Sequence, residues 1–402
     1  MDEVQIIVIS KNGTLINNLV DSFRELQPDW RIIQLSSAGQ TEEYIKFCSA
    51  IIIDSDLEKN ETVNLLNYLN AEYPPILKYL WVDGFNRDVL KEIISGIKGV
   101  MPQCIWKQQS ESVIADTISR AIIFADWLEF RHLSQALANM RDIPTVPFVY
   151  LKLMNLLNDV DSSVEDIAST VAEDPSLCAK VLKIANSAII GLREPVSSPF
   201  EAIMQLGIER IRAFLLSSRF ITQFEQQKVP WFSVERFWNH SMLTASYARQ
   251  IALYKVRDTR LADSSFTAGI LHDVGILIFA ANNPNSFREI ISTAISNGVP
   301  LHIAEKNLFG FTHSELAACL LSTWGLPLSI LEAIAAHHNP GKGFSTGFSP
   351  LSAVHIANSF ANEKHQDNNL CGDTSLDNEY LIKINCDTQL EEFKKLCFES
   401  AI

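Results

Sequence analysis

Histidine and aspartate side chains are concentrated in the second half of the chain, in a pattern that suits metal binding. All nine histidines follow residue 130, and two adjacent polar pairs, at 272–273 and 337–338, lie within or directly after apolar runs. Polar groups in such places are costly to bury without partners. The candidate metal ligands are His240, His272, Asp273, His313, His337 and His338.

The elements that must carry these side chains are helices. Neighbouring helical residues point about 100° apart, so we expect each polar pair to reach around one shoulder of a helix. Imidazole and carboxylate ligands from four helices suit Fe, Mn, Zn or Ni. Two such metals could activate a water molecule to attack a phosphodiester. His132, His302 and His365 are predicted to lie on the surface or in loops, and His355 is equally compatible with a core position.

Helical spacing dominates the chain from Leu133 onward. Asp174-Pro175 predicts a helix start, because a proline in the first turn costs no hydrogen bond. Gly207 predicts a break between helices at 200–206 and 208–220. Residues 362–378 are polar and predict a mobile loop. Asp387-Thr388 is expected to cap a last amphipathic helix.

The first half alternates short apolar runs with helical patterns. This alternation predicts one open α/β domain with a parallel sheet. We expect strands at 4–9, 31–36, 50–54, 76–82 and 103–106, and helices at 12–26, 41–47, 62–72, 88–97 and 110–128. The last helix is expected to run into a linker.

The order of these elements, with Asp54 ending the third strand, resembles the receiver domain of two-component response regulators. The resemblance implies a flavodoxin-like fold with Asp54 as phosphoacceptor and Lys107 beside it. The acidic pair that holds Mg²⁺ in that family is replaced by Ser10 and Lys11, and no hydroxyl residue follows the fourth strand. Because phosphoryl transfer needs the metal's charge, we expect a degenerate receiver scaffold.

Eight sequence blocks resemble the HDOD domain, in that family's order and spacing. The resemblance covers about residues 133–360 and implies an all-α fold related to the HD and HD-GYP phosphohydrolases. The blocks are IPTVP (143–147), EDP (173–175), ANSA (185–188), AIMQLG (202–207), FWNHS (237–241), AGILHDVG (268–275), WGLP (324–327) and HHNP (337–340).

The six candidate ligands fall where HD-GYP proteins keep metal ligands, but two other positions differ. The lysine of the HDxGK motif is replaced by Ile276, and the late aspartate ligand by Asn358. The GYP loop is also absent. Three interpretations stay open: a working phosphodiesterase, a metal site without catalysis, and buried histidines hydrogen-bonded to one another and to the backbone. We expect no resident cofactor, with a divalent metal at this residual site as the alternative.

Composition excludes several classes of function. The chain has a net charge of −14, and the segments before and after residue 130 carry −8 and −6. A nucleic-acid partner is disfavoured, because such proteins carry a basic surface. The seven scattered cysteines indicate reduced thiols, and the apolar stretch 266–281 is interrupted by a polar pair. We therefore expect a cytoplasmic protein of bacteria that does not contact a membrane.

The sequence thus predicts an α/β receiver-like domain (1–125), a linker helix (126–142), an all-α HDOD domain (143–360) and a polar loop with a C-terminal helix (361–402). The expected function is a non-catalytic signalling regulator that acts by protein–protein contact. Expected partners are an HD-GYP or other cyclic-di-GMP enzyme, a histidine kinase or a response regulator; a homodimer is left open. The alternative is a metal-dependent cyclic-dinucleotide phosphodiesterase.

Overall fold

The computed structural model describes residues 4–83, 92–93, 96–97, 102–144, 148–157, 163–187, 189–190, 192, 194–226, 229–364 and 373–399. The chain divides into two compact units. The first comprises Met1–Thr145 with Cys319–Leu328, and the second comprises Val146–Ala318 with Ser329–Ile402. The helix expected at 88–97 lies mostly outside the described residues, as do residues 145–147 of the first HDOD block.

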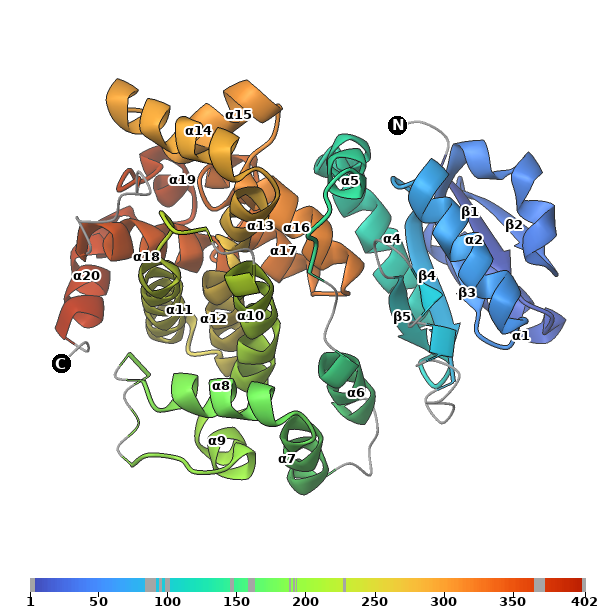
Figure 1. Ribbon diagram of the computed structural model, residues 1–402, viewed down its shortest axis with the longest axis horizontal. Coiled ribbons are helices and arrows are strands. Elements are labelled where there is room, and N and C mark those ends of the chain that lie inside the picture. The colour runs from blue at the N-terminus through green and yellow to red at the C-terminus, as the bar shows by residue number, and fades with distance from the viewer. Residues whose placement is uncertain are drawn as a thin grey trace. The chain divides into compact units, whose positions relative to one another are not determined.

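The first unit contains five parallel strands, as predicted (Figure 1). They are β1 (Gln5–Ile9), β2 (Arg31–Leu35), β3 (Cys48–Asp54), β4 (Leu77–Val82) and β5 (Gln103–Trp106). The order β2-β1-β3-β4-β5 is compatible with a flavodoxin-like domain. All residues of β1 and β4 are buried, which explains their nearly continuous apolar sequences.

The helices of the first unit differ from expectation in two places. They are α1 (Gly13–Leu26), α2 (Lys59–Glu72), α4 (Glu111–Trp127) and α5 (Phe130–Ala138). The predicted helix at 41–47 is instead two 3-10 turns, η1 (Ala38–Glu43) and η2 (Ile45–Phe47). The linker helix is not continuous, because Glu129 adopts a left-handed conformation with φ of 53° between α4 and α5.

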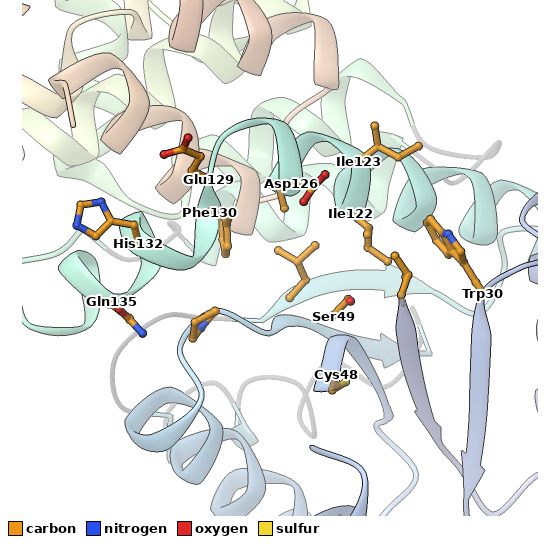
Figure 2. Close-up of a pocket in the computed structure, with 14 residues that line it drawn as sticks. Trp30, Cys48, Ser49, Ile122, Ile123, Asp126, Glu129, Phe130, His132 and Gln135 are labelled. Atoms are coloured by element: carbon orange, nitrogen blue, oxygen red, sulfur yellow. The ribbon is translucent and has the colours of Figure 1, made fainter. Parts of the chain in front are cut away.

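A pocket of about 440 Å³ lies at the amino ends of the strands in this unit (Figure 2). Cys48 comes from the start of β3 and Leu77 from the start of β4, while Ile122 and Phe130 come from α4 and α5. Burial raises the pKa of the Cys48 thiol to about 12, so this sulfur stays protonated and unreactive. The pocket is at the opposite ends of the strands from Asp54.

The second unit is helical, as predicted (Figure 1). Its helices are α6 (Phe148–Leu157), α7 (Val164–Ala172), α8 (Pro175–Ala185), α9 (Pro199–Leu206), α10 (Ile208–Gln226), α11 (Val234–Val256), α12 (Thr259–Leu271), α13 (Val274–Asn282), α14 (Pro284–Asn297), α15 (Leu301–Phe309), α16 (His313–Thr323, whose end clusters with the first unit), α17 (Leu328–Ala336), α18 (Pro350–Lys364), α19 (Asn378–Lys383) and α20 (Leu390–Glu399). Two 3-10 turns, η3 (Pro340–Lys342) and η4 (Asp387–Gln389), complete it.

Three helices of this unit, α11, α12 and α18, pack against one another, and α10 packs on α12. A glycine lets α12 approach α11 closely. A Cβ atom at Gly269 would lie 2.7 Å from the Cα of Ala245, so a larger residue there would push the helices apart. This close approach brings the end of α12 beside the middle of α11. One stretch of the described chain, Thr259–Asn282, is apolar and long enough to span a membrane, yet most of it is buried inside the protein.

Candidate metal centre

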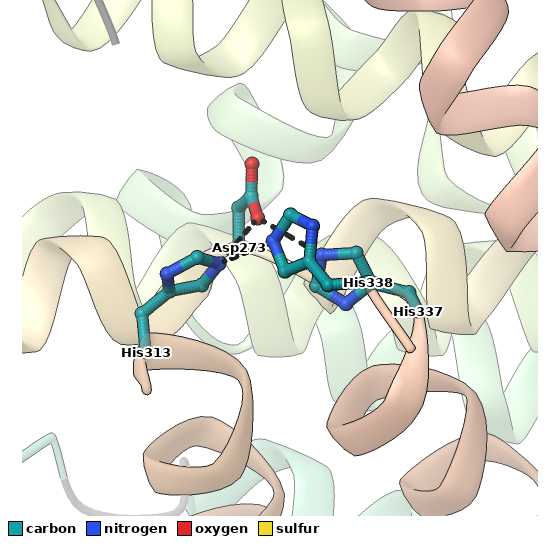
Figure 3. Close-up of side chains that lie close together, drawn as sticks. All are labelled: Asp273, His313, His337 and His338. Atoms are coloured by element: carbon teal, nitrogen blue, oxygen red, sulfur yellow. Dashed lines mark hydrogen bonds and ion pairs between the residues drawn. The ribbon is translucent and has the colours of Figure 1, made fainter. Parts of the chain in front are cut away.

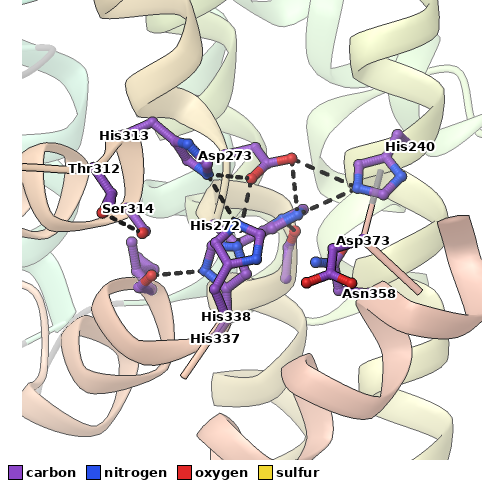
Figure 4. A network of polar contacts seen from close by, with 12 residues as sticks. His240, His272, Asp273, Thr312, His313, Ser314, His337, His338, Asn358 and Asp373 are labelled. Carbon is purple, nitrogen blue, oxygen red and sulfur yellow. Dashed lines mark hydrogen bonds and ion pairs between the residues drawn. The ribbon is translucent and has the colours of Figure 1, made fainter. Parts of the chain in front are cut away.

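The two polar pairs lie at helix ends, not on helix shoulders as the sequence predicted. His272 and Asp273 form the break between α12 and α13, and His337 and His338 follow the last residue of α17. His313 is the first residue of α16, whereas His240 lies in the second turn of α11. The structure brings these side chains together (Figure 4). At a helix end the backbone turns away, so both members of a pair can face the same point.

Gly275 sets the position of His313. A Cβ atom at Gly275 would lie only 2.0 Å from the carbonyl oxygen of His313. Only glycine therefore allows the start of α13 to pass so close to the start of α16. This packing places Asp273 within reach of the His313 ring.

The carboxylate of Asp273 is the centre of the cluster. Its Oδ2 atom lies 3.1 Å from Nε2 of His272 and 3.6 Å from Nε2 of His240. Its Oδ1 atom lies 3.1 Å from Nε2 of His313 and 3.6 Å from Nε2 of His337. The two oxygens thus face two separate groups of imidazoles, and one carboxylate could bridge two cations.

The opposite nitrogens of two rings are held by the backbone. Nδ1 of His272 donates to the carbonyl of Gly269 at 2.7 Å, and Nδ1 of His337 donates to the carbonyl of Ile334 at 2.8 Å. A carbonyl only accepts, so Nδ1 carries the proton in both rings. When these rings are neutral, Nε2 therefore carries a free lone pair. Outer hydrogen bonds of this kind orient the histidine ligands of metal sites.

Glu305 on α15 holds the third ring. Its Oε2 atom accepts from both Nδ1 (2.7 Å) and the backbone N–H (2.9 Å) of His313, and its side chain is fully buried. Sequence reasoning missed Glu305. The only sequence signal is an acidic residue inside the segment LHIAEKNLF, eight positions before His313.

His338 belongs to the second group of candidate ligands, together with Asp273, His313 and His337 (Figure 3). Its Nε2 atom lies 3.2 Å from Nε2 of His313. On its other side the ring of His302 stacks at a centroid distance of 4.1 Å with 14° between the planes. The expectation that His302 lies on the surface or in a loop was wrong, because this residue is part of α15 and lies beside the cluster. His132 is exposed, and His365 lies outside the described residues.

Burial and neighbouring charges shift the pKa values of the side chains in the cluster in different directions. Burial alone would raise the pKa of Asp273, but the adjacent His272 and His313 hold it well below its ordinary value. Burial opposes protonation of His313, yet the carboxylates of Glu305 and Asp273 raise its pKa to about 10, so a metal bound there would have to replace the proton on Nε2. Burial and neighbouring imidazoles lower the pKa of His337 and His338 well below the usual value. Those two rings are therefore neutral at pH 7, the form that binds metal.

His355 and Asn358, both on α18, lie next to this cluster. His355 is buried; its Nδ1 donates to the carbonyl of His337, and its Nε2 accepts from the backbone N–H of Asp377. It therefore fixes the backbone of a candidate ligand. The Oδ1 atom of Asn358 accepts from Asn362 at 3.3 Å.

The donors fit a divalent cation. The Nε2 atom of His337 is buried and has no hydrogen-bond partner among the described residues. It presents a lone pair to Oδ1 of Asp273, so two acceptors face each other. A hydrogen-bonded cluster without metal would leave this nitrogen unsatisfied, at a cost of about 1–3 kcal/mol. A cation between them satisfies both, which favours the alternative of a bound metal over the expectation of no cofactor.

The candidate phosphoacceptor of the first unit is already paired. Oδ1 of Asp54 lies 2.6 Å from Nζ of Lys107, and its Oδ2 accepts from the hydroxyl of Ser10 at 2.5 Å. Lys107 also pairs with Asp56 at 2.6 Å. Burial would lower the pKa of Lys107, but the two carboxylates raise it. Lys11 is exposed. This edge of the sheet therefore contains one buried carboxylate held by a cation and a hydroxyl.

Comparison with known proteins finds a family that the helical part of the chain resembles. Residues 143–340 match the model of the HDOD domain. A protein of Treponema pallidum described as uncharacterized is 24% identical over 201 residues, which are 49% of this chain and 38% of that protein. The chain thus matches well under half of the length of that relative.

Solved structures show the same fold. An HDOD domain protein with unknown function from Geobacter sulfurreducens is 23% identical, with a TM-score of 0.52 over 69% of this chain and 94% of that chain. The "Putative phosphohydrolase" from Shewanella amazonensis SB2B is also 23% identical, with a TM-score of 0.51 over 68% and 99%. The "Putative signal transduction protein" of Marinobacter aquaeolei VT8 is 17% identical, with a TM-score of 0.50 over 78% and 72%. Residues 143–340 are thus similar to the HDOD domain, and the solved structures share the fold of the helical part of the chain.

Proposed function

We propose that this protein is a signal-transduction regulator that acts by contact with other proteins and whose histidine cluster binds divalent metal without hydrolysing phosphodiesters. The observation that carries the proposal is a convergent set of six mostly buried donors beside a buried aliphatic residue. Ile276, next to Gly275, is 3% exposed and offers no charge to hold a substrate phosphate. Similarity to a protein described as a signal transduction protein supports a regulatory role.

The donor set supports two adjoining cation positions. His240 and His272 with one oxygen of Asp273 would form the first, and His313, His337 and His338 with the other oxygen would form the second. A bound divalent ion supplies positive charge and, in hydrolases, activates water. Glu305 and backbone carbonyls orient the donor side chains. The contacts among these side chains also link the ends of α12, α16 and α17 to α11. The cluster would thereby fix how these helices pack.

Purified full-length protein tests the enzymatic alternative. We expect tight binding of Mn²⁺ or Fe²⁺ in a direct metal analysis, and no turnover of cyclic di-GMP above a blank by the loaded protein. Turnover that disappears in His272→Ala would contradict the proposal and support the phosphodiesterase alternative.

The regulatory role is tested on partner activity. The expected partners, an HD-GYP or other cyclic-di-GMP enzyme, a histidine kinase or a response regulator, would be captured from the native cytoplasm. Because the chain carries a net charge of −14, we expect the partner to offer a basic surface and binding to weaken with salt. A change in the activity of a captured enzyme on adding the full chain supports the role. If no captured or candidate enzyme changes activity, the role is wrong.

A further inference from the structure

A third group of donor atoms adjoins the histidine cluster and lies outside the set that the sequence singled out. Ligand atoms of His302, His338 and Asp373 lie within 4.8 Å of one another. The three residues come from α15, from the turn after α17, and from the segment that precedes α19. All three side chains are partly buried, whereas the other two groups are almost wholly buried.

The ring of His302 contains a nitrogen that could bind a cation. Its Nδ1 atom is buried and has no hydrogen-bond partner among the described residues. The ring itself is held in place by stacking on His338. A buried ring nitrogen without a partner is costly, and a bound cation would satisfy it.

Asp373 brings a carboxylate to the side of the cluster where Asn358 offers only a neutral amide. The amide nitrogen of Asn362 donates to Oδ1 of Asn358 at 3.3 Å and to the backbone carbonyl of Asp373 at 2.9 Å. Figure 4 shows Asp373 and Asn358 on the same side of the network. The bridge through Asn362 fixes the backbone of Asp373, and one carboxylate oxygen accepts from the backbone N–H of Ser375 at 2.8 Å.

We propose that His302, His338 and Asp373 form a further cation-binding position at the edge of the histidine cluster. Two imidazoles and one carboxylate are the donors of open Zn²⁺ sites, which keep a position for water or another ligand. Because His338 also belongs to the second group, this position adjoins the two proposed above. Among the candidate ligands of the two positions proposed above, Asp273 is the one carboxylate. Asp373 adds a second, and its negative charge helps to hold several multivalent cations close together.

This inference rests on the proposed metal site, and the test separates the two. Metal-free full-length protein is titrated with Zn²⁺ alone, and the number of bound equivalents is measured by calorimetry and by elemental analysis after dialysis. We expect Asp373→Asn and His302→Gln each to bind about one equivalent less than the unaltered protein, with Asp373→Glu restoring part of the binding. The exposed carboxylate of Asp387 provides the control Asp387→Asn, which should bind normally.

Circular dichroism and melting curves check that each variant is folded. If Asp373→Asn and His302→Gln keep every equivalent while His272→Ala loses some, the third position is wrong and the proposed metal site stands. If the unaltered protein binds no Zn²⁺, both are wrong. Loss of one equivalent in either folded variant, with the control unchanged, supports the third position.

Discussion

Oε2 of Glu305 lies 2.7 Å from Nδ1 of His313, at a point where neither side chain is more than 2% exposed. The carboxylate accepts a hydrogen bond from Nδ1–H and so turns Nε2 toward Asp273, 3.1 Å away. This contact makes Glu305 the residue that aims one candidate ligand of the metal centre. Partners of this kind raise the basicity of the histidine ligand and fix its ring.

We expect Glu305→Gln to weaken metal binding about 10- to 100-fold, the usual effect of losing such a partner. The amide keeps the size of the side chain but loses the negative charge beside His313. Glu289 on α14 is exposed, and Glu289→Gln is the matched control. Competition with a chelator of known affinity measures the change. Equal affinities for both variants would show that Glu305 does not orient a metal ligand.

Gly275→Ala is expected to destabilise the helical unit and to weaken metal binding. Its Cβ atom would overlap the carbonyl of His313, so the starts of α13 and α16 must separate. Steric conflicts of this kind cost about 1–3 kcal/mol or more. The control is Gly347→Ala, where a Cβ atom meets nothing within 4 Å. Urea unfolding and metal titration provide the two measurements; a Gly275→Ala variant as stable as its control would refute the packing argument.

Asp54 is expected to resist phosphorylation by small phosphodonors. Ser10 and Lys107 already occupy both of its oxygens, and Ser10 and Lys11 offer no carboxylate for Mg²⁺. We expect no Mg²⁺-dependent binding of beryllofluoride by fluorescence or NMR. The double variant Ser10→Asp/Lys11→Asp should gain such binding. Beryllofluoride binding by the unaltered chain that disappears in Asp54→Asn would show an active receiver.

Lys78 is expected to make the stability of the first unit depend on pH. The side chain is 7% exposed, and its ammonium group donates to the carbonyls of Pro74 and Ile76. Burial lowers its pKa from 10.5 to about 7. Between these values the unfolded chain binds more protons than the folded one, so stability rises as the pH rises from about 7 to 10.5.

Lys78→Met should remove this dependence and stabilise the unit below pH 7, by an amount on the order of a few kcal/mol. Lys46 is exposed, and Lys46→Met serves as the control. Urea unfolding at pH 6, 8 and 10 measures the slope. A slope unchanged by Lys78→Met would mean that the lysine keeps its ordinary pKa in the folded protein.

The sequence by itself determined the class of each half and many of the element boundaries. Continuous apolar runs such as Gln5–Ile9 belong to strands that a parallel sheet buries on both faces. Gly207, with φ of 84°, ends α9 where a residue with a side chain would be strained. Periodicity and turn chemistry are local properties, so they can be read without knowing the fold. Residue types also singled out the six donors, because histidines in apolar helices need partners.

Only the tertiary structure decided how those donors meet and which others join them. The pairs at 272–273 and 337–338 lie at helix ends. Gly269 and Gly275 let the backbone on either side of the first pair approach α11 and α16 closely, and local periodicity does not record that approach. Glu305 and Asp373 come to the cluster from segments that carry no motif. Their roles depend on which helix packs against which. Such contacts join different helices and segments, and their geometry exists only once these have packed together.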